Sequence, residues 1–196
     1  VAFDGRERAM AGAQMTGADL FEATFSGADL RGIKAHGLNF IQADLRSIVL
    51  AGAELTKCNF VEVDVSSVDF SGATLTGSVF VSVKDRDKPA ILAVARRIAE
   101  LGFEILASTG TAKALEDGGL KVRRINKVME GQPHIVDAIL NGEVQLVFNT
   151  TEGWQSLKDS QTIREAALKS KVPYFTTAPA SLATARAIEA LRGHAL

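Results

Sequence analysis

A short run of small hydroxyl residues around one glycine is the part of this sequence best suited to chemistry. It lies at Ser108 to Thr111, where the apolar run Phe103 to Ala107 gives way to a helical pattern. Ser108 or Thr109 can cap that helix with a side-chain oxygen, and Gly110 lets backbone N–H groups approach a ligand at the positive end of the helix dipole. Phosphate cradles are built this way. Because an ordinary capped turn uses the same residues, the interpretation depends on the neighbouring elements.

The second half of the chain alternates strand and helix patterns. Apolar runs predict strands at 79–83, 103–107, 122–125, 144–149 and 173–177. Helical spacing predicts helices at 88–101, from the hydroxyl run to 118–119, and at 133–140, 160–171 and 179–192. This alternation predicts an α/β domain, with a five-stranded parallel sheet between two layers of helices. Ligands bind such sheets beyond the carboxyl ends of the strands.

Polar side chains follow four of these strands. The groups are Lys84–Lys88, Ser108–Thr111, Asn126 with Lys127, and Asn149–Thr151. Since parallel strands end on the same edge, we expect these groups to converge. Lysines, hydroxyls and helix N-termini suit a phosphate, and Asn149 and Thr151 can hydrogen-bond a sugar or base. Each residue alone is explained equally well as a solvated lysine or a turn residue, so the prediction depends on their joint placement.

The first half has a strict five-residue period. From Ala13 to Ser82 the third position of each block is large and apolar, except for Ala35, and the first position is small or aliphatic. Neither a helix period near 3.6 nor a strand period of 2 produces this spacing, so the chain must turn corners regularly. The pattern predicts a β-solenoid with the first and third positions inside and the other three outside.

These blocks resemble the pentapeptide-repeat family. Its motif, Ala-(Asp/Asn)-Leu-X-X, is matched by Ala18-Asp19-Leu20, Ala28-Asp29-Leu30 and Ala43-Asp44-Leu45. The resemblance implies a right-handed quadrilateral β-helix with four blocks per turn. Some members are acidic DNA mimics that bind a topoisomerase. Here the acidic residues alternate with basic ones, including Arg31 and Arg46, which favours a structural or interaction scaffold over that role.

The second half resembles another family, through four motifs. These are the segments 79–88 (VFVSVKDRDK), 107–112 (ASTGTA), 122–137 (VRRINKVMEGQPHIVD) and 147–153 (VFNTTEG). They look like the C-terminal regulatory domain of the carbamoyl-phosphate synthase large subunit, a methylglyoxal-synthase-like domain. In that family the domain binds allosteric effectors, UMP and IMP in bacteria, and regulates catalytic domains elsewhere in the large subunit.

The resemblance also implies roles for individual residues. The effector phosphate would be held by Lys88, Ser108, Thr109, Gly110, Thr111 and Lys127, and the nucleoside by Asn149, Thr150 and Thr151. Ser108 stands where some members have threonine, which keeps a hydroxyl.

Methylglyoxal synthase itself uses an acidic base where this chain has Gln132, and an amide cannot act as a general base. An acid/base pair of Glu130 and His134 is the remaining catalytic alternative. It competes with the interpretation of His134 as a helix-cap residue. We therefore expect no enzyme activity, no catalytic residue, no metal and no cofactor. A lyase that releases methylglyoxal from dihydroxyacetone phosphate stays as the alternative.

Composition sets the remaining limits. The 196 residues are 46% hydrophobic and 23% charged, with a net charge of −1, which favours neither nucleic-acid nor membrane binding. Residues 1–77 contain ten acidic and six basic residues, whereas 78–196 contain thirteen and sixteen, so the second half suits an anionic ligand better. A single cysteine, Cys58, fits a cytoplasmic protein and, from its inward block position, a packed thiol.

We expect two domains, a solenoid at 1–77 and an effector-binding domain at 78–196. The start at Val1 favours a fragment, a processed chain or an engineered chimera of two families that are not usual partners. Open strand edges at the ends of a solenoid favour pairing into a homodimer.

Overall fold

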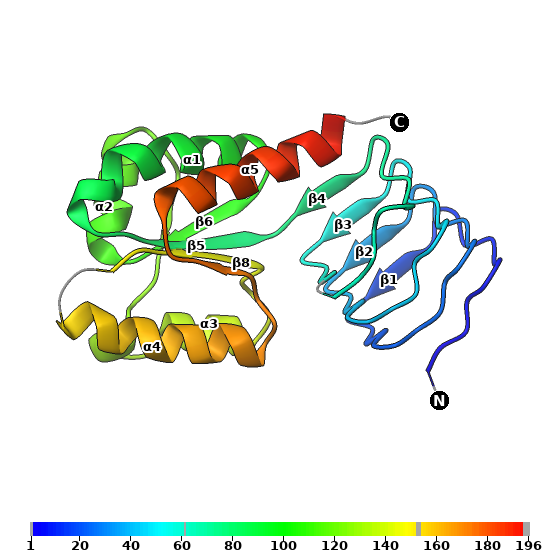
Figure 1. The fold of residues 1–196 in the computed structure, drawn as a ribbon, viewed down its shortest axis with the longest axis horizontal. Coiled ribbons are helices and arrows are strands. Elements are labelled where there is room, and N and C mark those ends of the chain that lie inside the picture. Colours follow the sequence, from blue (N-terminus) through cyan, green and yellow to red (C-terminus); the bar gives the residue numbers. More distant parts are fainter. Residues whose placement is uncertain (1, 61, 152–153, 194–196) are drawn as a thin grey trace. The chain divides into compact units, whose positions relative to one another are not determined.

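The chain divides into two compact units (Figure 1). In this computed structural model, residues 2–60, 62–151 and 154–193 are described, with the side chains of 154–157 and 191–193 left out. The first unit comprises Val1–Thr76 and Ile188–Leu196, and the second comprises Gly77–Ala187. Within the described part of the chain, no helix has the length and apolar character needed to span a bilayer.

The first unit is a parallel β-solenoid. Its longest rungs form a four-stranded sheet in the order β1-β2-β3-β4, with the strands β1 (Gln14–Thr16), β2 (Lys34–His36), β3 (Glu54–Thr56) and β4 (Thr74–Thr76). Gln14 pairs with Lys34, and the isolated bridges keep the same offset, as in Asp19 with Asn39. One coil therefore takes four blocks of five residues, which confirms the predicted solenoid.

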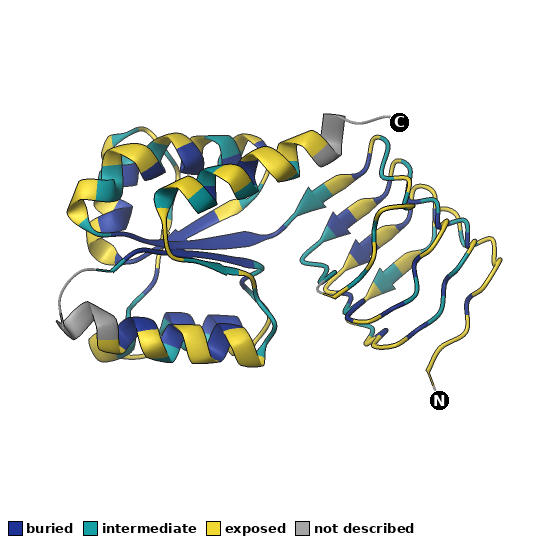
Figure 2. Cartoon of the chain, in the orientation of Figure 1, coloured by how far each residue is buried: buried dark blue, intermediate teal, exposed yellow. Residues whose placement is uncertain are grey.

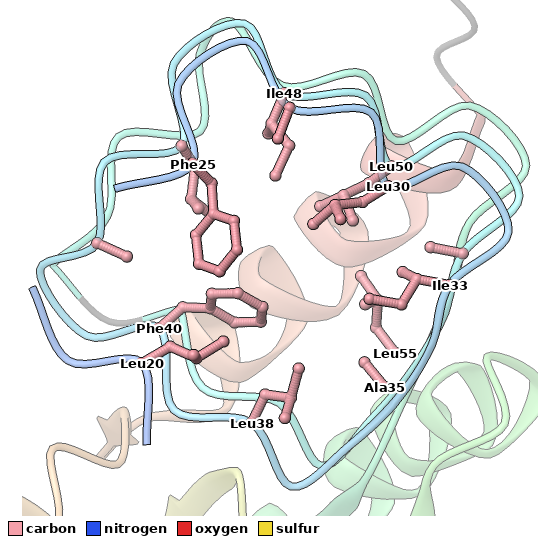
Figure 3. Packing of buried hydrophobic residues seen from close by; sticks show 14 of the residues in the cluster. Leu20, Phe25, Leu30, Ile33, Ala35, Leu38, Phe40, Ile48, Leu50 and Leu55 are labelled. Atoms are coloured by element: carbon pink, nitrogen blue, oxygen red, sulfur yellow. The ribbon is translucent and has the colours of Figure 1, made fainter. Parts of the chain in front are cut away.

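The interior of the solenoid is filled by the two inward columns of the sequence pattern. Figure 3 shows Phe25, Phe40 and their neighbours pointing into the space enclosed by the coils. Phe40 stacks on Phe60, with ring centroids 4.9 Å apart, and meets Phe25 edge-on at 6.1 Å. The first-position residues also point inward, and Ala23, for example, is 0% exposed. Their small side chains leave room for the rings of the third position.

The corners explain two other features of the repeat. The fifth position of the block adopts a left-handed backbone, as at Gly17 (φ 62°), and Ser47 takes it as well (φ 58°). At the second position, Asp19 Oδ1 accepts the backbone N–H of Phe21 at 3.2 Å, and the other second-position aspartates repeat this bond. Aspartate is thus favoured there because its side chain satisfies a backbone donor in the turn.

Arginines at the fourth position pair with several of these aspartates. Arg31 Nη2 lies 2.6 Å from Asp29 Oδ2, and Arg46 Nη2 lies 2.8 Å from Asp44 Oδ2. The hydrogen bond from Arg31 lowers the pKa of Asp29, and the bond from Arg46 lowers that of Asp44. These carboxylates are neutralised within their own block, which supports the expectation of a scaffold over an acidic DNA mimic.

The thiol of Cys58 provides a test of the solenoid interior. Burial raises its pKa to about 11. At pH 8 the folded protein should therefore form on the order of 100-fold less thiolate than an exposed cysteine, and iodoacetamide should modify Cys58 correspondingly slowly. Because the folded-state pKa is raised, folding is favoured below the unfolded pKa, and this contribution is lost as the pH rises towards 11. Modification at the rate of the urea-unfolded chain would contradict the protection expected of this half-buried thiol.

The second unit is a five-stranded parallel sheet between two layers of helices. The strand order is β7-β6-β5-β8-β9, and the strands are β5 (Ser78–Ser82), β6 (Glu104–Ala107), β7 (Arg123–Arg124), β8 (Leu146–Asn149) and β9 (Tyr174–Phe175). The central strands are buried along their whole length (Figure 2), as expected for a sheet covered on both faces.

The helices lie on both faces of the sheet (Figure 1). They are α1 (Lys88–Glu100), α2 (Thr109–Asp117) and α5 (Ala178–Gly193) on one face, and α3 (Ile135–Leu140) and α4 (Trp154–Lys169) on the other. Short 3-10 turns at Asp85–Asp87 and Val128–Glu130 precede α1 and α3. Phe80 packs in the cluster that includes Ile135 and Ile163, which joins β5 to α3 and α4.

The α/β architecture is confirmed, and several predicted boundaries are wrong. Helix α4 begins at Trp154, six residues before the predicted start at Ser160. Strand β7 has only two residues, because its segment carries charged side chains and lies at a sheet edge. Helix α3 begins at Ile135 rather than at Pro133.

Candidate functional site

A pocket of about 360 Å³ opens at the carboxyl end of the parallel sheet in the second unit. Its lining comes from the segments that follow β5, β7 and β8 and from one side of α4. Ser82, Lys84 and Lys127 line it, together with Asn149–Thr151 and Asp159. The location is the one expected for a ligand site in such a sheet. Among the described residues, no group of three or more histidine, cysteine or acidic side chains is placed to hold a metal ion.

Two threonine hydroxyls, that of Thr150 in the pocket lining and that of Thr111 next to Val83 of the lining, are fixed by backbone donors. Thr111 Oγ1 accepts the N–H of Val83 at 3.0 Å, and Thr150 Oγ1 accepts the N–H of Lys84 at 3.2 Å. These bonds occupy an oxygen lone pair in each hydroxyl. The hydrogen of Thr150 is thereby left to donate, whereas the Thr111 hydroxyl donates to the carbonyl oxygen of Val83, with Oγ1 3.4 Å from that oxygen. The Thr150 hydroxyl is thus prepared to donate a hydrogen bond to an anion.

The N-terminus of α2 lies beside these hydroxyls. Ser108 occupies the N-cap position, but the predicted cap bond is absent among the described residues. Its hydroxyl instead bonds Ser82 Oγ at 2.9 Å and Thr111 Oγ1 at 3.4 Å. The first N–H groups of α2, beginning with Thr109 and Gly110, have no intrahelical carbonyl to bond. They remain available to a ligand, with the positive end of the helix dipole behind them.

Three lysines supply positive charge. Lys84 and Lys127 line the pocket, and Lys84 Nζ lies 3.7 Å from Asp87 Oδ2. Lys88 extends towards the α2 N-terminus: a Cβ built on Gly110 would lie 3.8 Å from Lys88 Nζ. Its ammonium pairs with Asp85 at 2.7 Å. The exposed carboxylate of Asp85 leaves that pair open to exchange with an incoming anion.

The part of the pocket lining that comes from β8 and α4 presents hydrogen-bond acceptors. Asn149 Nδ2 donates to Ser160 Oγ at 2.9 Å and to Tyr174 OH at 2.6 Å. Asp159 is only 7% exposed, and its buried Oδ1 has no hydrogen-bond partner in the part of the chain that the structure describes. A buried oxygen without a donor is costly unless a ligand satisfies it. The lining therefore carries two kinds of group: lysines and a donor hydroxyl on Lys84, Lys127 and Thr150, which we name the donor end, and acceptors on Asn149 and Asp159, which we name the acceptor end.

The structure places the predicted site residues in two adjoining sets. Lys127, Asn149, Thr150 and Thr151 line the pocket. The other predicted residues, Lys88 and the segment Ser108–Thr111, adjoin it through the hydroxyl contacts described above.

The sequence analysis did not identify Ser82, Asp159, Ser160 or Tyr174 as site residues. Asp159, Ser160 and Ile163 all line the pocket from α4. Their spacing of one and three residues places them on one side of a helix. The predicted helix began at Ser160, so it left out Asp159 and the side of α4 that the three residues share.

The residues of the catalytic alternative lie elsewhere or are engaged. Gln132 is exposed and lines a separate, shallow hollow with Pro133 and Leu140. Glu130 Oε2 accepts the backbone N–H of Lys127 at 2.9 Å. His134 caps α3 by accepting the N–H of Asp137 at Nδ1, 3.4 Å away, so its interpretation as a cap residue is confirmed.

Comparison with protein families assigns both halves of the chain. The model described as MGS-like domain matches residues 90–176, and the model described as pentapeptide repeats (8 copies) matches residues 9–34 and 36–80. Residues 90–176 form an MGS-like domain. The repeats lie in the solenoid, so each structural unit of the chain corresponds to one family.

Curated relatives of the MGS-like region are carbamoyl phosphate synthase large chains. The chain from Mesorhizobium japonicum is 50% identical over 116 residues, which cover 59% of this chain and 10% of that protein. The one from Pseudomonas syringae pv. tomato is 55% identical over 109 residues, covering 56% and 10%. The C-terminal section from Methanopyrus kandleri is 48% identical over 113 residues, covering 57% and 21%. This chain thus spans about a tenth of the first two relatives, and the matches show homology to their MGS-like region only.

Proposed function

We propose that the MGS-like unit is a non-catalytic domain that binds a nucleoside monophosphate as an allosteric effector. The observation that carries this proposal is the polarity of the pocket, which has hydrogen-bond donors and lysines at one end and acceptors at the other. A nucleoside monophosphate has the complementary polarity, since its phosphate only accepts hydrogen bonds near neutral pH and its sugar hydroxyls can donate them. UMP and IMP are the effectors of first choice.

The phosphate would lie at the donor end. Lys127 and Lys84 line the pocket and would provide positive charge, and the Thr150 hydroxyl in the same lining would donate a hydrogen bond. Lys88 and the free N–H groups at the start of α2, from Thr109 to Thr111, would extend this end towards the α2 N-terminus, beside the Ser108 hydroxyl. Each predicted phosphate ligand then acts as a donor or a positive charge, as an anion requires.

The nucleoside would lie at the acceptor end. Asp159 lines the pocket, and a small rotation of its side chain would let the unpaired Oδ1 accept a hydrogen bond from a ribose hydroxyl. Asn149 and Thr151 line the same part of the pocket and offer further hydrogen bonds. Ile163 adds an apolar contact from α4 for the face of a sugar or base.

The partner of this domain would be the catalytic part of a carbamoyl phosphate synthase, since the curated relatives are large chains of that enzyme. Effector binding would then regulate ligase chemistry that occurs outside the 196 residues. The solenoid would serve as a scaffold beside it, in a natural or engineered chimera of two families. The open edge of β1 is the surface through which two copies could form a homodimer.

The direct test is a calorimetric titration of the full chain with UMP and with IMP at low salt. The Lys127→Ala variant should bind about 10- to 100-fold more weakly, because it loses a charge-assisted hydrogen bond to phosphate. Lys113→Ala is the matched control, since Lys113 is an exposed residue of α2 that pairs with Asp117. It should bind like the unmodified chain.

Two results would refute the proposal. One is the absence of binding heat with either nucleotide from a chain shown to be folded. The other is release of methylglyoxal from dihydroxyacetone phosphate, which would make the domain a lyase. If the Lys113 and Lys127 variants lost nucleotide affinity equally, the effect of Lys127 would be explained by the net charge of the chain and not by a contact in the pocket.

A further inference from the structure

The amide group of Asn149 is held in one orientation by two hydroxyls from different elements. Its nitrogen donates to Ser160 on α4 and to Tyr174 on β9, and these two hydroxyls also lie 2.8 Å from each other. Asn149 is 4% exposed and Ser160 is 3% exposed, so the cluster is shielded from bulk water. Both N–H bonds of the amide are therefore used within the protein.

This arrangement determines what Asn149 can offer to a ligand. A side-chain amide has two donors on nitrogen and two lone pairs on oxygen. With both donors used, only Oδ1 is left, and no described residue donates a hydrogen bond to it. Asn149 lines the pocket beside Asp159, whose Oδ1 also has no donor. The two side chains together form a surface that accepts hydrogen bonds and donates none.

The geometry points to Tyr174 and Ser160 as positioning residues that keep Asn149 an acceptor and so select effectors with hydroxyl donors at this end. The inference rests on the proposed function and adds a determinant of specificity to it. A ligand with a vicinal diol satisfies both oxygens. A ligand without the diol would leave the Asn149 and Asp159 oxygens without a donor, and a site built around polar groups discriminates strongly against such a ligand.

Tyr174 is well placed for this role. It lies on β9, in register with Val147 of β8, and so sits at a fixed distance from Asn149 at the end of that strand. The guanidinium of Arg164 lies over its ring, 5.4 Å from the centroid. The ring is thus held independently of the hydroxyl. Tyr174→Phe removes one hydrogen-bond acceptor and keeps the strand pairing and the cation–π contact.

The first test requires no ligand. NMR spectra of the selectively labelled chain should show the Asn149 side-chain amide protons shifted downfield and slow to exchange. In Tyr174→Phe one of these protons should move upfield and exchange faster, and Ser160→Ala should affect the other. Thr162→Ala, which removes a hydroxyl of α4 that bonds the Lys158 carbonyl, should change neither. Unchanged Asn149 signals in both pocket variants would overturn the inference, whether or not nucleotides bind.

The second test measures selectivity. We expect UMP to bind the unmodified chain about 100-fold more tightly than 2′,3′-dideoxy-UMP, because the analogue leaves both oxygens unpaired. In Tyr174→Phe this ratio should fall about 5-fold, the effect of one neutral hydrogen bond. The affinity for inorganic phosphate should stay within about 2-fold, because phosphate contacts only the donor end.

The outcomes separate the two proposals. If UMP, IMP and inorganic phosphate all fail to bind, the proposed function falls, and the NMR result still decides whether Tyr174 and Ser160 orient Asn149. If UMP and inorganic phosphate weaken equally in Tyr174→Phe, the tyrosine supports the pocket as a whole and the specificity role is refuted. A dideoxy analogue that binds the unmodified chain as tightly as UMP refutes it as well.

Discussion

Replacing Phe40 with alanine should destabilise the solenoid by about 3–5 kcal/mol, the usual effect of truncating a buried phenylalanine. Its side chain is 1% exposed and lies between Phe25 and Phe60 in the row of rings inside the coils. Coils of a solenoid contact mainly their neighbours, so a cavity there weakens the interface on both sides. The large effect follows because buried neighbours such as Ala23 and Ala43 are too small to fill the gap that the missing ring would leave.

The measurement is the rate of Cys58 modification as urea is increased, because the protected thiol reacts when the solenoid opens. Hydrogen exchange of the β5 and β8 amides should report the second unit separately. Phe21→Ala is the matched control: Phe21 is 42% exposed, and its loss should change the stability by less than about 1 kcal/mol. A Phe40 variant as stable as the Phe21 variant would show that the ring row does not hold the solenoid together.

Replacing Asp159 with asparagine should have opposite effects on stability and on binding. In the ligand-free chain Oδ1 of Asp159 is buried without a partner, a state that costs about 1–3 kcal/mol. The amide of asparagine has the same shape and no charge, so the free energy of unfolding should rise by about 1 kcal/mol. UMP binding should weaken about 30-fold, because a hydrogen bond from a ligand hydroxyl to a charged group is stronger than one to an amide.

Urea unfolding followed by exchange of the β8 amides, together with calorimetry, gives both quantities. Asp117→Asn, at the exposed end of α2, serves as the control and should change neither beyond a few tenths of a kcal/mol. A variant that binds UMP normally would show that Asp159 does not contact the nucleoside. A variant that is both less stable and weaker in binding would show that the carboxyl group has a partner within the fold.

The architecture could be predicted from sequence because each half has a period that few structures satisfy. The fourteen consecutive blocks of five residues predict a solenoid. With four blocks in each coil, paired rungs must lie 20 residues apart, as the structure shows. The α/β half follows from alternating strands and helices. The start of α4 was missed because the polar residues around Asp159 do not show an apolar stripe, and packing against the sheet rather than local propensity determines where that helix begins.

The convergence of residues at the carboxyl edge of the sheet could be expected from the sequence, whereas the contacts that Ser160 and Tyr174 make there could not. Ser108–Thr111 and Lys127 follow strands directly, so their place at the sheet edge could be inferred from order in the chain alone. Tyr174 and Ser160 come from the last strand and from the middle of a helix, and their meeting with Asn149 depends on the pairing of β8 with β9. Such contacts between distant segments leave no local pattern. The N-cap bond predicted for Ser108 failed for a related reason, because Ser82 on the adjacent strand competes for the same hydroxyl.

The constant offset between paired rungs also constrains how the first unit can change in length. In the described part of the solenoid, the paired rungs join residues 20 positions apart, as Asn39 bonds Asp19. Duplicating or losing one whole coil, such as residues 34–53, would leave each remaining rung beside a neighbour of the same block position. Gaining or losing a single block of five residues would shift all later blocks by a quarter of a coil, so that they would pair with the wrong side of the neighbouring coil. Natural variants of this solenoid should therefore differ in length by complete coils. Tandem duplication can then lengthen the solenoid only in steps of one coil.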